Sequence, residues 1–210
     1  MIRTRSLARR TALVATALAT GLVLAACGSN DNGDGGGNGH AGHSSASKPP
    51  ATGAHNAADV SFAQSMIPHH RQAVEMADLA PSRASSGEIK DLAEKIKKAQ
   101  DPEIETMSGW LKGWHEQVPG DSMPGMDHSG HAGMPGMMSE KDMAGLKAAK
   151  GADFDKRFAE LMIAHHKGAV SMAKTERKDG RDPAAKKLAA DVIKTQSAEI
   201  EDLRTLLDRL

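Results

Sequence analysis

The sequence predicts an all-α protein, a four-helix bundle assembled from two repeated helical hairpins. The first observation is a repeat: the motif of residues 62–77 returns in residues 158–173, at an offset of 96 residues. The second is that the apolar spacing of 92–111 recurs at the same offset in 188–207. The third is composition: aromatic residues make up only 2% and tyrosine is absent, which favours a core of aliphatic and methionine side chains. One amphipathic hairpin cannot bury its apolar face alone, so the two are expected to pair.

Residues 1–26 are expected to form a signal peptide. An apolar stretch, 11–24, follows a basic segment that contains Arg3, Arg5, Arg9 and Arg10. The segment ends in Leu-Ala-Ala-Cys27, which resembles a bacterial lipobox and implies cleavage before Cys27 and lipid attachment to its thiol. The alternative is an ordinary signal peptide with an incidental cysteine, but Cys27 is the only cysteine in the chain. We therefore expect an extracytoplasmic lipoprotein, anchored in the cell membrane, with residues 27–58 as a flexible tether.

The first hairpin is expected to occupy residues 59–118. Its first helix begins near Asp59, a plausible N-cap, and ends before Pro81. Its second helix opens with a capping-box pattern from Ser85 to Glu88 and ends near Val118. Residues 119–139 keep no periodic apolar pattern and are expected to be a linker.

The second hairpin is expected within residues 140–210, so that 59–210 forms one bundle domain. Ser139 and Asp142 are expected to cap a short helix that ends near Lys150. The third long helix spans about 153–178 and carries the second copy of the repeat. Asp182 is expected as the N-cap of the fourth long helix, with Pro183 at its first position.

Each copy of the repeat places two adjacent histidines between two methionines. Thioethers are soft donors and imidazole is a borderline one, which suits copper, with Cu(I) favoured and Cu(II) also open, better than magnesium, calcium or manganese. We expect the two copies to face each other across the bundle, with one histidine of a pair on the metal and the other bonded to Gln100 or Gln196. The alternative for the methionines is ordinary core packing. The candidate ligands are Met66, His69, His70, Met76, Met162, His165, His166 and Met172.

The linker supplies a second group of candidate donors, spaced by glycine and proline. They resemble the methionine- and histidine-rich segments of exported copper-resistance proteins, and a flexible run of this kind could wrap copper without a preformed cage. The alternative is a solvated linker, although five methionines in residues 119–138 are unusual for an exposed segment. These donors are Met123, Met126, His128, His131, Met134, Met137 and Met138.

The chain resembles a bacterial family called domain of unknown function 305. The resemblance rests on the two Met-x-x-His-His-x-x-Ala-x-x-Met copies and on the Gln-x-x-Glu-Ile-x-x-Met-x-x-Trp-Leu pattern of residues 100–111, and it covers nearly all of 59–210. It implies a ferritin-like fold, and some members resemble exported copper-binding proteins. The fourth long helix departs from the pattern, because Leu203 and Leu206 replace the methionine and tryptophan of the second.

These observations predict a non-enzymatic protein that buffers, sequesters or transfers copper at the cell envelope. A di-metal redox enzyme is one alternative, but the second and fourth helices offer Gln-x-x-Glu where ferritin-like di-iron sites use Glu-x-x-His. A helical interaction module without metal is another. The expected partners are a metal ion, the lipid anchor and an unidentified copper-transfer protein. Few aromatic residues and balanced charge, with 27 basic and 27 acidic residues, argue against nucleic acid.

Overall fold

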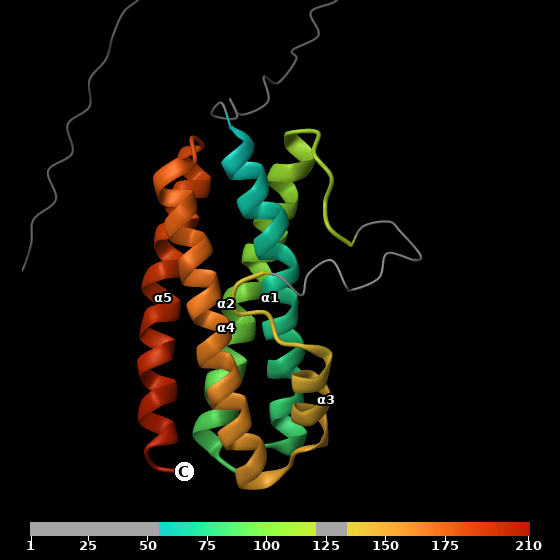
Figure 1. The fold of residues 1–210 in the computed structure, drawn as a ribbon, viewed down its shortest axis with the longest axis vertical. Coiled ribbons are helices and arrows are strands. Elements are labelled where there is room, and N and C mark those ends of the chain that lie inside the picture. The colour runs from blue at the N-terminus through green and yellow to red at the C-terminus, as the bar shows by residue number, and fades with distance from the viewer. Residues whose placement is uncertain (1–54, 121–133) are drawn as a thin grey trace, which may run out of the picture. The chain divides into compact units, whose positions relative to one another are not determined.

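The described part of the chain, residues 55–120 and 134–210 of a computed structural model, is all helical (Figure 1). The expectation of an all-α fold is therefore confirmed. The four long helices are α1 (Ala57–Arg83), α2 (Gly87–Gly113), α4 (Gly151–Asp179) and α5 (Pro183–Leu207). The short helix α3 (Glu140–Ala148) precedes α4. None of the helices in these two ranges combines the length and the apolar character that crossing a membrane requires.

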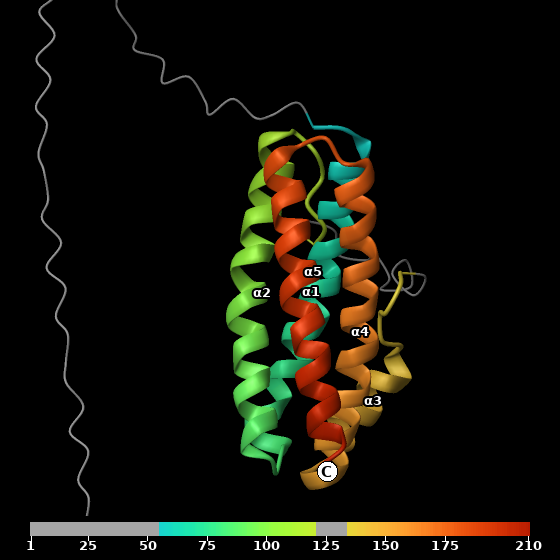
Figure 2. The ribbon, with the colours of Figure 1, turned by 90° about the vertical axis from the view of Figure 1, so that its left-hand side faces the viewer.

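The four long helices run side by side as two hairpins, α1 with α2 and α4 with α5 (Figures 1 and 2). The hairpins meet mainly through α1 and α4, while α2 and α5 touch less extensively and α3 packs on α4 and α1. α1 and α4 are antiparallel, so the two copies of the repeat run past each other in opposite directions. This arrangement relates the copies by an approximate two-fold axis across the α1–α4 contact.

Several helix ends differ from the sequence-based expectation. α1 is capped by Asn56, whose side chain accepts hydrogen bonds from the N–H groups of Ala58 and Asp59, and it continues through Pro81 to Arg83. The N-cap of α2 is Ser86, and α2 ends at Gly113, well before Val118. The expected caps Ser139 of α3 and Asp182 of α5 are confirmed.

Asp59 and Asp155, which occupy equivalent positions in the two copies, join the hairpins to each other. Asp59 on α1 accepts hydrogen bonds from the N–H groups of Arg181 (3.0 Å) and Asp182 (2.9 Å), at the start of α5. Asp155 on α4 accepts from the N–H groups of Ser85 (3.1 Å) and Ser86 (2.9 Å), at the start of α2. Each hairpin turn is thus held by a buried carboxylate of the other hairpin. Asp59 also accepts a hydrogen bond from the Asn56 N–H (2.6 Å), which completes the capping box of its own helix.

One of these two ends carries an additional acid, Glu176, whose equivalent in the first copy is Ala80. Burial and the adjacent Asp59 raise the pKa of Glu176 to about 8. Burial alone would raise the pKa of Asp59 too, but hydrogen bonds from Glu176 and from backbone N–H groups lower it. At neutral pH, Glu176 is therefore a neutral acid beside the Asp59 carboxylate.

The apolar interior is divided into two clusters by a layer of polar side chains. Along α1, the residues up to Ile67 belong to one cluster and those from Ala73 to the other, and along α4 the change occurs between Ile163 and Ala169. The interval contains the histidine pair of each copy. The cluster that contains Ala73 also includes Met76, Phe154, Phe158, Met162 and Leu203. The cluster that contains Ile67 also includes Phe62, Met66, Met107, Leu111 and Val192.

Candidate metal centre

The centre of the polar layer is the contact between His69 of α1 and His165 of α4. The centroids of their rings are 3.7 Å apart and the ring planes are inclined by 37°. Both side chains are completely buried. Because these residues are equivalent in the two copies, the approximate two-fold axis passes between their rings. The two copies of the repeat therefore face each other across the bundle, as the sequence predicted.

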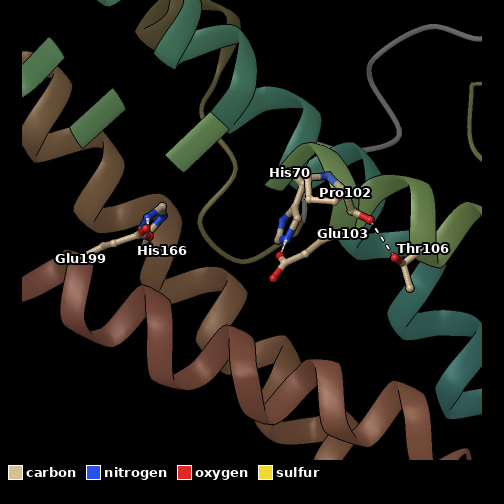
Figure 3. Close-up of polar contacts among 6 residues, drawn as sticks. All are labelled: His70, Pro102, Glu103, Thr106, His166 and Glu199. Carbon is tan, nitrogen blue, oxygen red and sulfur yellow. Dashed lines mark hydrogen bonds and ion pairs between the residues drawn. The ribbon is translucent and has the colours of Figure 1, made fainter. Parts of the chain in front are cut away.

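The second histidine of each copy is paired with a glutamate of the neighbouring helix (Figure 3). His70 Nε2 lies 2.7 Å from Glu103 Oε2, and His166 Nε2 lies 2.7 Å from Glu199 Oε2. The two pairs join α1 to α2 and α4 to α5, so each is internal to one hairpin. A carboxylate that accepts an imidazole N–H fixes both the tautomer and the ring orientation, and it makes the other ring nitrogen a stronger donor.

These glutamates, and not Gln100 or Gln196, are the hydrogen-bond partners of the histidines, so that expectation was wrong. Both amides are buried, but neither contacts an imidazole through a hydrogen bond in the described part of the chain. A charged acceptor forms a stronger hydrogen bond than a neutral amide, which favours the carboxylate one turn further along the same helix face. The Gln-x-x-Glu spacing, present in both hairpins, was the signal that could have identified Glu103 and Glu199.

Five buried imidazole nitrogens have no hydrogen-bond partner among the described residues. They are the Nδ1 atoms of His69, His70, His165 and His166, together with Nε2 of His165. His69, His70 and His166 each have Nε2 engaged, by the Pro135 carbonyl at 3.1 Å or by a glutamate. When Nε2 carries the proton, Nδ1 presents a lone pair, and a buried lone pair without a donor is a favourable position for a cation.

The histidines at the two-fold axis are held neutral, as metal ligation requires. Burial and the neighbouring His70 lower the pKa of His69 from 6.5 to about 3, although the Pro135 carbonyl acts in the opposite direction. Burial and the neighbouring His69 lower the pKa of His165 well below 6.5, opposed weakly by the His69 backbone. Neutral imidazole is the form that binds a metal, so protons do not compete for these nitrogens at physiological pH.

The methionines of the repeat lie on either side of the histidine layer. Met66 and Met162, each one turn before the first histidine of its copy, are fully buried in opposite apolar clusters. Met76 shares its cluster with Met162, while the half-buried Met172 packs against the cluster of Met66. A rise of 1.5 Å per residue puts Met66 about 4.5 Å along α1 from His69, and Met76 about 10 Å in the other direction. The histidine layer is thus bordered by a thioether on both sides.

Only part of the linker and none of the N-terminal segment falls within the described residues. Met134, Met137 and Met138 are half-buried, and Met138 packs against the apolar cluster of Met76. The segment that contains them crosses α1 and α4 beside the His69–His165 contact. Met123, Met126, His128 and His131, like the lipidation candidate Cys27, lie outside the described residues.

The residues that border this layer offer sulfur as well as nitrogen donors. Within residues 55–120 and 134–210, no three histidine, cysteine or carboxylate side chains converge closely enough to hold a metal. The glutamates are engaged with His70 and His166, which leaves the imidazoles at the axis as the central nitrogen donors. Two imidazoles bordered by thioethers form a soft donor set with low negative charge, which fits a monovalent soft cation better than a hard divalent one.

A sequence profile described as domain of unknown function, DUF305, matches residues 59–207. The chain belongs to this family. A DUF305 protein from Streptomyces coelicolor has a crystal structure that superposes with a TM-score of 0.64 at 35% identity, covering 72% of this chain and 93% of that one. The helical bundle is thus the fold of a DUF305 protein, and the resemblance to this family that the sequence indicated is confirmed.

Another structure similar to this DUF305 chain is that of CopM in its Cu(II)-bound form. It is 34% identical, with a TM-score of 0.61, and the match covers 72% of this chain and 96% of CopM. CopM has also been crystallised with Cu(I) and with silver. A curated relative, uncharacterized protein L153 of Acanthamoeba polyphaga mimivirus, is 39% identical over 54 residues, so the chain matches only 36% of its length.

Proposed function

We propose that this protein binds copper as cargo, favouring Cu(I), and buffers, sequesters or transfers it at the cell envelope without catalysing a reaction. The observation that carries the proposal is the His69–His165 contact, in which two buried imidazoles that carry unpartnered nitrogens lie ring against ring. An apolar core gains nothing from such a pair, because each unsatisfied buried nitrogen disfavours folding. A cation bound at the edges of these rings would satisfy the nitrogens, because their lone pairs lie in the ring planes.

Similarity to CopM supports the nature of the ion. CopM has been crystallised with Cu(II), Cu(I) and silver, and silver shares the preference of Cu(I) for thioether and imidazole donors. In this chain, the residues that would supply sulfur are Met66 and Met162. The Glu103 and Glu199 carboxylates would orient the neighbouring histidines of the layer.

An extracytoplasmic location completes the proposal. It rests on the signal-peptide and lipobox patterns that end at Cys27, and on similarity to a Streptomyces coelicolor protein described as a candidate secreted protein. The lipid on Cys27 would hold the bundle at the membrane surface. Mass spectrometry of the membrane-bound protein should find a diacylated Cys27 as the first residue, and an unmodified longer chain would contradict the anchor.

The test of copper binding is competition for Cu(I) between a chelator and purified protein that lacks residues 1–26. We expect stoichiometric uptake, and weaker uptake when Met66 and Met162 are both changed to leucine, because leucine keeps the packing and removes the sulfur. Ile67→Leu together with Ile163→Leu is the matched control, since it alters neighbouring buried positions without touching a donor. Unchanged affinity of the Met66→Leu, Met162→Leu double variant would remove the thioethers from the site. Iron in the isolated protein, with turnover of oxygen or peroxide, would instead favour the di-metal enzyme.

A further inference from the structure

Residues 134–138, called the strap below, lie across α1 and α4 beside the imidazole pair (the yellow segment in Figure 1). On α1, the amide of Gln72 holds Met138 through two hydrogen bonds, donating to its carbonyl (3.0 Å) and accepting from its N–H (2.7 Å). The Pro135 carbonyl accepts a hydrogen bond from His69 Nε2 at 3.1 Å. The strap is therefore docked on the candidate site and in direct contact with one of its imidazoles.

The strap begins with a tight turn that fits closely against α4. The N–H of Met137 donates to the Met134 carbonyl at 3.2 Å, and Gly136 has φ of +80°, which together with Pro135 matches a type II turn. A Cβ on Gly136 would lie 2.8 Å from the carbonyl oxygens of Ala164 and His165. Only glycine satisfies both the backbone angle and this close approach.

The two copies of the repeat differ at the position where the strap docks. Gln72 of α1 corresponds to Gly168 of α4, 96 residues later. A Cβ on Gly168 would lie 1.9 Å from the Pro135 carbonyl oxygen, so the absence of a side chain makes room for the turn. One copy thus supplies the amide that clamps the strap, and the other supplies the space that receives it.

We infer that the strap is the gate of the metal site, and that Gln72 and Gly168 are the residues that seat it. His69 and His165 have no exposed surface when the strap is docked, so an ion can reach them only after some part of the wall moves. The strap is non-helical, and three hydrogen bonds to side chains of α1 hold it. α1 and α4 are held by the backbone hydrogen bonds of long helices, which in α1 are interrupted at Pro68 and Pro81. Local opening proceeds through the segment with the fewest such constraints.

This gate rests on the proposed function, and the docked strap also determines which nitrogen meets the ion. As long as the Pro135 carbonyl holds His69 Nε2–H, the lone pair is on Nδ1, so the strap can remain closed over a bound ion. Opening the strap frees this imidazole and exposes the pair. The strap should consequently slow both uptake and release of the ion.

The test compares Gly168→Ala with Gly109→Ala in the purified full-length protein. Both exchanges replace a helical glycine by alanine, but a Cβ on Gly109 meets nothing within 4 Å, whereas one on Gly168 collides with the strap. In metal-free protein, carbethoxylation by diethyl pyrocarbonate, localised by peptide mass spectrometry, reports the exposure of His69 and His165. With metal, stopped-flow transfer of silver ion to a chelator reports release.

We expect Gly168→Ala to accelerate both the modification of the two histidines and the release of silver. Losing one or two hydrogen bonds should raise the open population roughly tenfold. Gln72→Ala should act in the same direction without a steric clash, and it replaces the first variant if that one fails to fold. The control Gly109→Ala should react like the wild-type protein.

Two results would overturn the gate. In the metal-free protein, unchanged modification of both histidines in Gly168→Ala and Gln72→Ala would mean that the strap does not cover them. Faster modification with unchanged silver release would mean that ions leave by another route. If wild-type protein takes up no metal, the proposed function fails, while the modification experiment still decides whether the strap covers the imidazoles.

Discussion

Replacing His165 by leucine should stabilise the metal-free protein, although it removes a central residue of the candidate site. Both nitrogens of His165 are buried and neither makes a hydrogen bond of regular geometry with a described residue. An unsatisfied buried polar group disfavours the folded state by about 1–3 kcal/mol, and an apolar side chain of similar size removes that penalty. We therefore expect His165→Leu to raise the free energy of unfolding by roughly 1–3 kcal/mol at pH 7.

The advantage of His165→Leu should increase as the pH falls. The folded-state pKa of His165 lies well below 6.5, so below that pH the unfolded chain binds a proton that the folded chain excludes. Stability from this group is therefore present above pH 6.5 and is lost on acidification, at about 1.4 kcal/mol per pH unit. Between pH 6.5 and pH 5 the difference between variant and wild type should widen by about 2 kcal/mol.

The assay is urea unfolding of metal-free protein, followed by circular dichroism at pH 7 and at pH 5. The matched control is His166→Leu, the same exchange one residue later, which should destabilise because it leaves the nearly buried Glu199 without its imidazole partner. Silver ion should raise the stability of the wild type and not that of His165→Leu. Destabilisation of His165→Leu by more than about 1 kcal/mol at pH 7 would refute the claim that its nitrogens are unsatisfied without metal.

Two further predictions concern the ends of the bundle. The pKa of Glu176 is raised from 4.5 to about 8 in the folded chain. The folded chain therefore keeps a proton that the unfolded chain has lost, and the free energy of unfolding should fall as the pH rises from 4.5 to 8. Glu176→Gln should abolish this decline, up to about 1.4 kcal/mol per pH unit, in urea unfolding at pH 5 and pH 8; a slope equal to that of the wild type would contradict it. Asp155→Ala should remove the hydrogen bonds to Ser85 and Ser86 and reduce stability by about 3 kcal/mol, seen as a melting temperature roughly 10 °C lower. The exposed Asp153→Ala is its control, and an equal effect of both exchanges would show that the contact between hairpins adds nothing.

The repeat made the fold predictable from sequence. An offset of 96 residues, shared by the motif helices and by their partners, indicated two equivalent hairpins, and the apolar spacing indicated which faces they bury. The meeting of the two copies followed from the same symmetry, but which equivalent residues touch did not, and the packed helices select His69 and His165. Glu103 was missed as the partner of His70, although the Gln-x-x-Glu spacing and the stronger hydrogen bond of a charged acceptor indicated it over Gln100.

Capping patterns read from the sequence misplaced the first residues of α1 and α2, because side chains near these helix starts also make tertiary contacts. Asp59 was expected as the N-cap of α1, but Asn56 is the N-cap. The Asp59 carboxylate accepts both from the Asn56 N–H, as the third residue of the capping box, and from the start of α5. Ser85 likewise donates to Asp155 and leaves the cap of α2 to Ser86. Docking of the strap was also beyond the sequence, because Gly168 reads as an ordinary helical glycine until the turn at Pro135 is seen against it.

The reciprocal carboxylates have a consequence for the covalent continuity of the chain. Since Asp59 and Asp155 each complete the turn of the opposite hairpin, the two halves hold each other by contacts that do not depend on the peptide that connects them. Halves produced as separate polypeptides should therefore recombine into the same bundle. By the same geometry, a single ancestral hairpin could build this histidine layer by pairing with a second copy of itself.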